Sequence, residues 1–122
     1  AEGHISYVAM DIKAPFERYQ DITTIPNSGR GAESSVRVVV ASRVPHEFRT
    51  TWHPALLSLD NLRVIAHSLA ERGAQSWFVQ KFRREGCPSW MLRNSVLLPG
   101  EVPEHLCAEF AGMFWRFGIR EP

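Results

Sequence analysis

The apolar and polar positions of this chain predict strands that alternate with helices. Residues 5–12 are mostly apolar and almost unbroken, as expected for a strand of a parallel sheet that is covered on both faces. Pro15 ends this strand, and the Pro, Asn, Ser and Thr residues of 21–30 predict a loop. Residues 31–42 contain β-branched residues typical of a strand, but their valines also form a helical stripe, so we favour a helix.

The alternation continues in the second half of the chain. Residues 46–54 are predicted as a second strand, which Pro54 stops. Ser58 is predicted to cap a helix that ends before Gly73 and has an apolar face of Leu62, Ile65, Ala66 and Leu69. Residues 74–82 are predicted as a third strand, and residues 86–100 as irregular.

A last amphipathic helix is predicted after Pro103. Its apolar stripe is assigned to the core, together with two tryptophans: Leu106, Phe110, Met113, Phe114, Trp77 and Trp115. Strands that alternate with helices predict an α/β fold with a parallel sheet and right-handed crossovers. In such sheets the functional residues gather beyond the carboxyl ends of the strands, which here are Asp11 with Lys13, residues 49–53 and residues 80–83.

Two charged residues, Asp11 and Lys13, lie at the end of the first apolar run. Asp11 and Lys13 are two positions apart, so in a strand they point to the same side. A carboxylate and an ammonium group on one side of a strand end suit a polar site better than a core. The alternative is a structural ion pair.

Composition narrows the class of protein. The chain has 122 residues and a formal net charge of +1, as expected for one globular domain and not for a protein that binds nucleic acid. The basic cluster of Lys81, Arg83 and Arg84 is too short to change this. We find no stretch typical of a membrane span or a signal peptide and expect a cytoplasmic protein. Cys87 and Cys107 fit no metal motif and are expected to be ordinary thiols, with a disulfide as the alternative.

Three segments carry a resemblance to a known family. "YVAMDIKAPFERY", "HEFRTTWHPALLSLDNLRVIAHSL" and "WFVQKFR" resemble, in order and spacing, the C-terminal half of the radical S-adenosylmethionine activating enzymes. The likeness is greater to activating enzymes of anaerobic ribonucleotide reductase than to those of pyruvate formate-lyase. It implies that residues 1–122 are one domain, with the C-terminal half of a partial (β/α)6 barrel at about 5–83 and an extension at 84–122.

The resemblance also implies a chemistry for the parent protein. In this family a four-iron four-sulfur cluster reduces S-adenosylmethionine, and the resulting 5'-deoxyadenosyl radical takes a hydrogen atom from a glycine of the large reductase subunit. The cluster is held by a CxxxCxxC loop, and this chain contains no such motif. We therefore expect a fragment or a truncated relative that is inactive alone. The alternatives are a non-catalytic half-barrel interaction module, or an activase of pyruvate formate-lyase or another glycyl radical enzyme.

The resemblance assigns roles to six residues. Lys13 would bind the carboxylate of S-adenosylmethionine, and Asp11 would bind its ammonium group or a cation. Arg49 matches a cofactor-side arginine, or is structurally paired. The ribose or adenine would lie near one or two residues of 50–52, with Thr51 as the named candidate. Gln80 and Arg83 would approach the adenine; the alternative for Arg83 is a surface basic turn.

Two further expectations concern His53 and the outer edge of the first strand. His53 is interpreted as a loop histidine, since no third metal ligand lies at a useful spacing from it and His46. In a half-barrel the first strand would present an unpaired parallel edge, which favours association. We expect a homo-oligomer through this edge, or an edge covered by the C-terminal segment. The expected partner is the reductase large subunit, with no nucleic acid and no membrane.

Overall fold

A computed structural model describes residues 7–54, 56–81 and 102–120 of the chain. Four strands, β1 (Val8–Asp11), β2 (His46–Trp52), β3 (Ser76–Lys81) and β4 (Arg116–Arg120), form one sheet in the order β1-β2-β3-β4. All three strand pairs are parallel. The helices are η1 (Phe16–Arg18), α1 (Tyr19–Thr23), α2 (Ser28–Ser42), α3 (Leu59–Glu71) and α5 (Glu104–Ala111). The predicted α/β class and parallel sheet are confirmed.

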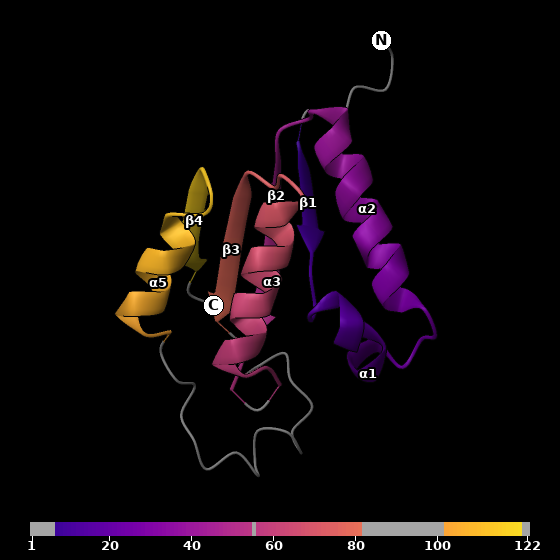
Figure 1. Cartoon of the computed structure of the whole chain (residues 1–122), viewed down its shortest axis with the longest axis horizontal. Helices are drawn as coiled ribbons and strands as arrows, with labels where there is room; N and C mark the ends of the chain where they lie inside the picture. Colours follow the sequence, from indigo (N-terminus) through magenta and orange to yellow (C-terminus); the bar gives the residue numbers. More distant parts are fainter. Residues whose placement is uncertain (1–6, 55, 82–101, 121–122) are drawn as a thin grey trace.

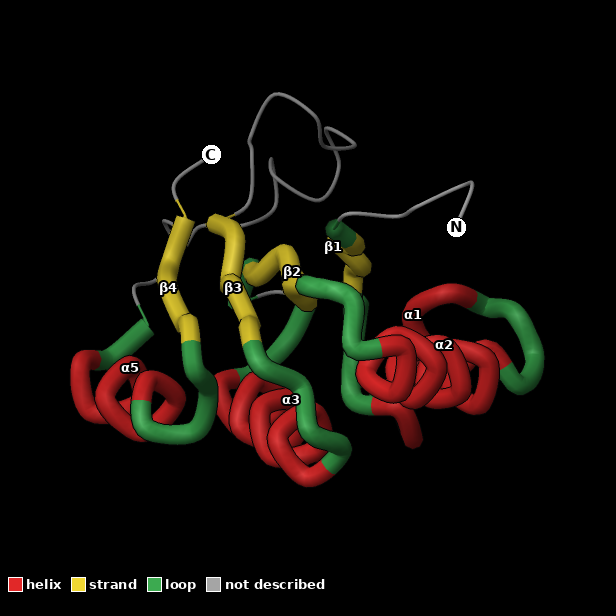
Figure 2. The backbone as a smooth tube through the Cα atoms, turned by 90° about the horizontal axis from the view of Figure 1, so that it is seen from above, coloured by secondary structure: helices red, strands yellow, loops and turns green. Residues whose placement is uncertain are grey.

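The helices of the described residues lie on one side of the sheet. Figure 2 shows α1, α2, α3 and α5 on the same side, with the strands in sequence order beside one another. The second face of the sheet is called the open face below. Because side chains alternate along a strand, the register places three rows of residues on the open face, with Tyr7 before the first. The rows are Ala9, Glu47, Ser76 and Arg116; Asp11, Arg49, Phe78 and Gly118; and Thr51, Gln80 and Arg120.

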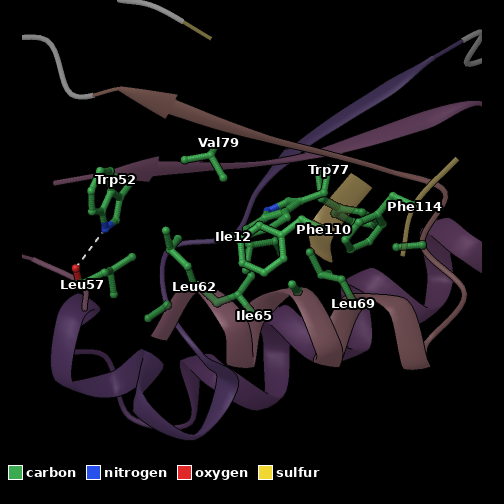
Figure 3. Close-up of a cluster of buried hydrophobic side chains, with 14 of the residues drawn as sticks. Ile12, Trp52, Leu57, Leu62, Ile65, Leu69, Trp77, Val79, Phe110 and Phe114 are labelled. Carbon is green, nitrogen blue, oxygen red and sulfur yellow. Dashed lines mark hydrogen bonds between the residues drawn. The ribbon is translucent and has the colours of Figure 1, made fainter. Parts of the chain in front are cut away.

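The core lies between the sheet and the helices. Trp77 of β3 is fully buried, and its ring meets that of Phe110 of α5 edge-on at 5.2 Å between centroids. Ile65 and Leu69 of α3 point toward the same cluster (Figure 3). The indole N–H of Trp77 donates to Thr50 Oγ1 at 3.0 Å, so these two buried polar groups satisfy each other.

Local sequence signals explain the helix ends. Ser58 Oγ accepts from the Asn61 backbone N–H at 3.0 Å, and Asn61 Oδ1 accepts from the Ser58 N–H at 3.0 Å, which makes a capping box at the start of α3. Gly73 has a φ of +87°, a conformation that glycine adopts without strain, and it follows the end of α3 as predicted. At Gly29 a Cβ would lie 2.0 Å from the Phe16 carbonyl oxygen, so only glycine lets α2 approach η1.

Several sequence-based predictions for the first half of the chain are wrong in detail. Of the strand predicted at 5–12, residues 5–6 lie outside the described residues, and β1 spans Val8–Asp11. It is not covered on both faces, because Ala9 and Asp11 are exposed on the open face. The loop predicted at 21–30 contains the end of α1 and the start of α2, which begins at Ser28. The helix predicted at 31–42 is confirmed as the larger part of α2.

The C-terminal segment departs most from prediction. The helix α5 ends at Ala111, so Met113 and Phe114 lie beyond it, although Phe114 is still buried. Trp115, predicted as core, is 83% exposed. The chain then forms β4, which the sequence pattern did not predict, and β4 pairs with β3. Residues 102–120, the described part of the C-terminal segment, therefore add to the sheet at the edge opposite β1, and they do not cover the β1 edge (Figure 1).

Within the described residues, the outer edge of β1 pairs with no other strand, as expected. Among the helices of the described residues, none combines the length and the apolarity that a membrane crossing requires.

Candidate functional site

The predicted strand-end pair lies at the carboxyl end of β1. Asp11 and Lys13 are both exposed, and they flank Ile12, which is 1% exposed. The Ile12 N–H donates to the Arg49 carbonyl oxygen at 2.7 Å, which extends the pairing with β2 past the end of β1. The Lys13 N–H donates to the Tyr19 hydroxyl at 3.2 Å, and burial raises the pKa of that hydroxyl. The backbone that carries both charged groups is therefore anchored on each side.

Arg49 is the residue that the structure brings to Asp11. The two are aligned in the β1–β2 register, and Arg49 Nε lies 3.3 Å from Asp11 Oδ1. Both side chains are partly exposed, at 32% and 62% respectively. Arg49 Nε is itself buried and makes no hydrogen bond, so the pair is an ion pair without hydrogen-bond geometry. Arg49 and Asp11 therefore attract each other by charge, and Arg49 Nε makes no hydrogen bond to the carboxylate.

Thr51 and Gln80 are the next aligned pair on the open face. Thr51 is exposed and Gln80 is half-buried. The neighbours Thr50 and Trp52 are buried on the helix-covered face, so the strand alternation selects Thr51 from residues 50–52. Trp52 Nε1 donates to the Leu57 carbonyl oxygen at 3.0 Å (Figure 3). Arg83 lies outside the described residues.

The two histidines of the second strand segment do not form a metal site with their neighbours. His46 is buried, and its Nε2 accepts from the Gln75 backbone N–H at 3.3 Å. His53 is also buried, directly after β2. The described residues contain no group of three or more His, Cys, Asp or Glu side chains that could hold a metal ion. Of the two cysteines, Cys107 has its Sγ 3.7 Å from the Val102 carbonyl oxygen, and Cys87 lies outside the described residues.

A buried carboxylate on the open face was missed by the sequence analysis. Glu47 is 6% exposed, and its Oε2 and Oε1 accept from Arg120 Nη1 and Nη2 at 2.6 and 3.1 Å. The Tyr7 hydroxyl donates to Glu47 Oε1 at 2.7 Å and accepts from Arg116 Nη2 at 2.8 Å. These contacts connect β2 and β4 with Tyr7, the residue before β1, across the open face. We call Tyr7, Glu47, Arg116 and Arg120 the cross-strand network.

The environment of the cross-strand network shifts the pKa values of Glu47 and Tyr7. The hydrogen bond from Arg120 is the largest cause that lowers the pKa of Glu47, against a smaller opposing effect of burial. Burial, followed by the hydrogen bond to Glu47, raises the pKa of Tyr7. Glu47 is therefore a carboxylate at neutral pH. One signal for it was present in the sequence: an acidic residue inside the strand "HEFRTT", on the opposite side from Phe48.

A small pocket lies near the carboxyl ends of β1 and β2, and it does not coincide with the predicted site. Its volume is about 240 Å³, and Arg18 and Asp21 form an ion pair of 4.0 Å in its wall. None of the predicted site residues lines it. The lining residues are Ala14, Pro15, Arg18, Asp21, Ile22, Leu56, Leu57 and Asn61. The candidate site is therefore the carboxyl-terminal part of the open face, and this pocket is separate from it.

Comparisons with models of protein families, with curated proteins and with solved structures found no match to this chain.

Proposed function

We propose that this chain forms one wall of an S-adenosylmethionine pocket in a radical S-adenosylmethionine activase. The observation that carries the proposal is the ion pair of Asp11 and Arg49 at the carboxyl end of adjacent parallel strands, with the exposed Lys13 two residues after Asp11. The amino-acid end of S-adenosylmethionine is a zwitterion, so a carboxylate and two cations match its ammonium and carboxylate groups. The alternative interpretation is a structural ion pair between strands. It explains the contact of Asp11 with Arg49, but it gives the exposed Lys13 no role.

The strand order also supports a barrel. Four parallel strands follow one another in sequence order with the described helices on one side, which is how successive units of a (β/α) barrel are arranged. In a doubly wound sheet the strand order would reverse and helices would cover both faces. The open face would then line the inside of the barrel, and the ligand would lie at the carboxyl ends of its strands.

The described residues fit S-adenosylmethionine but not an iron–sulfur cluster. Thr51 and Gln80 offer a hydroxyl and an amide for the ribose and adenine, next to the charged groups on the same face. The Arg49 side chain is 32% exposed, which leaves part of its guanidinium accessible to an anionic group. By contrast, the described residues hold no set of cluster ligands, so no cluster chemistry is assigned to them. Once bound and reduced, the cofactor supplies the radical; these residues would bind and orient it.

The proposed partner is a glycyl radical enzyme of the anaerobic ribonucleotide reductase type. This rests on the "EFRTT" and "QKFR" segments and their separation from "MDIKAP". Association of two copies through the outer edge of β1, and location in the cytoplasm, stay predictions.

Calorimetric titration of the chain with S-adenosylmethionine tests the proposal. We expect Lys13→Ala to weaken binding about ten- to a hundredfold, because a charge-assisted contact to the carboxylate is lost. Arg37→Ala is the matched control: it removes one positive charge from an exposed position of α2, where Arg37 pairs with Glu33 at 3.7 Å. Binding that is equal in wild type, Lys13→Ala and Arg37→Ala would reject the site, and so would the absence of binding at millimolar ligand.

A further inference from the structure

Phe78, in the middle of the open face, is covered by an arginine. The guanidinium carbon of Arg120 lies over the Phe78 ring at 3.9 Å from its centroid, while that of Arg116 is farther away at 5.8 Å. A Cβ at Gly118 would meet two ring carbons of Phe78 at 3.3 Å, so glycine at this position leaves room for the ring across β4. The Phe78 ring of β3 therefore packs against both Gly118 and the Arg120 guanidinium of β4.

Glu47 fixes the position of this guanidinium. Arg120 is aligned with Gln80 in the β3–β4 register, yet its side chain reaches back across Phe78 to Glu47 on β2. The two-point contact uses both Nη groups of Arg120 and restricts rotation of its plane. It also neutralises the positive charge, which makes Arg120 a poor binding site for an anion and leaves its flat face as the surface for contact.

We propose that Phe78 and Arg120 form a stacking platform for a planar nitrogen heterocycle, with Glu47 as the residue that positions Arg120. Phe78 covers one face of the guanidinium, and the Arg120 side chain is still 39% exposed, which leaves its opposite face for a ligand ring. Gln80, aligned with Arg120, supplies an amide for the ring edge. The identity of the heterocycle rests on the proposed function, which makes it the adenine of S-adenosylmethionine.

The test uses adenosine as the probe, because it has the heterocycle but not the amino-acid end. In the wild-type chain we expect intermolecular nuclear Overhauser effects between the adenine protons and the Arg120 side chain. Arg120→Lys keeps the charge opposite Glu47 but removes the planar surface, and we expect it to weaken adenosine binding about three- to thirtyfold. Arg37→Lys is the control: it makes the same chemical change at an exposed position of α2, where Arg37 pairs with Glu33, and it should change the affinity by less than about twofold.

The outcomes separate this inference from the proposed function. Adenosine that shows no contact with Arg120, or binds equally well to Arg120→Lys, overturns the platform even where Lys13→Ala still weakens S-adenosylmethionine binding. Conversely, an adenosine affinity that depends on Arg120, with S-adenosylmethionine binding insensitive to Lys13, supports the platform and rejects the assigned site of the amino-acid end. The contact measurement uses wild-type protein, so it decides the question even where Arg120→Lys does not fold.

Discussion

The two faces of the sheet are built from the same strands, so neighbouring residues can be compared directly. On β3, Trp77 is fully buried among aromatic side chains, whereas Phe78 is half-buried beneath an arginine. On β2, Phe48 packs in the core, and its neighbour Glu47 holds Arg120. One face is stabilised by apolar burial and the other by paired charges. Residues of the open face can therefore serve a ligand while the opposite face maintains the fold.

The largest expected effect comes from comparing a residue of the helix-covered face of β3 with its neighbour on the open face. Trp77→Ala should lower the free energy of unfolding by about 3–5 kcal/mol, because it leaves a cavity beside Phe110 and removes the hydrogen bond to Thr50. Phe78→Ala, one residue away on the open face, should cost only about 1–2 kcal/mol, since less surface is buried and the lost arginine contact is partly exposed. Urea denaturation measures both. Equal costs would mean that the two faces contribute alike.

A second pair on β2 tests the same division with a smaller change. Thr50→Val leaves the buried indole N–H of Trp77 without its acceptor and should cost about 1–2 kcal/mol. Thr51→Val makes the same chemical change at an exposed position and should stay within about 0.5 kcal/mol. Thermal unfolding of the two variants gives the comparison. A Thr51 variant less stable than the Thr50 variant would contradict the assignment of the faces.

The sequence pattern predicted the helix-covered face better than the open face, for a physical reason. Periodicity reports burial against a neighbouring layer, so the strands at Phe48 and Trp77 and the helix capped by Ser58 were predictable. The strand β4 was missed, because "RFGIR" is short, contains Gly118 and follows apolar residues at helical spacing. Trp115 was predicted in the core, but it lies beyond the end of α5 and is exposed.

The residues of the candidate site could likewise be predicted only in part from the sequence. Asp11 and Lys13 were identified from their spacing, which is a local property of a strand. The contact of Glu47 with Arg120 joins residues 73 positions apart and depends on β4. No local pattern marks it, and the cross-strand network therefore required the structure.

The smallest expected effect is a dependence of stability on pH that belongs to the open face. Because Arg120 lowers the pKa of Glu47 below its ordinary value of 4.5 in the folded state, Glu47 contributes stability that is fully present above about pH 4.5. This contribution is lost as the pH falls through the lowered pKa of the folded protein. Glu47→Gln has no such contribution, so its stability should approach that of wild type as the pH falls from 7 to 3.

The matched control for this pH dependence is Glu109→Gln on α5. Hydrogen bonding from Arg63 lowers the pKa of Glu109 in the same direction, but Arg63 and Glu109 lie at the surface. Salt screens such a pair, so its pH dependence should be weak and should nearly vanish in 1 M NaCl, whereas that of Glu47 should persist. Urea denaturation across this pH range at both salt concentrations makes the measurement. A Glu47 dependence that salt removes as completely as that of Glu109 would show that the open face carries ordinary surface charges. It would also remove the reason to treat Arg120 as held in a fixed position.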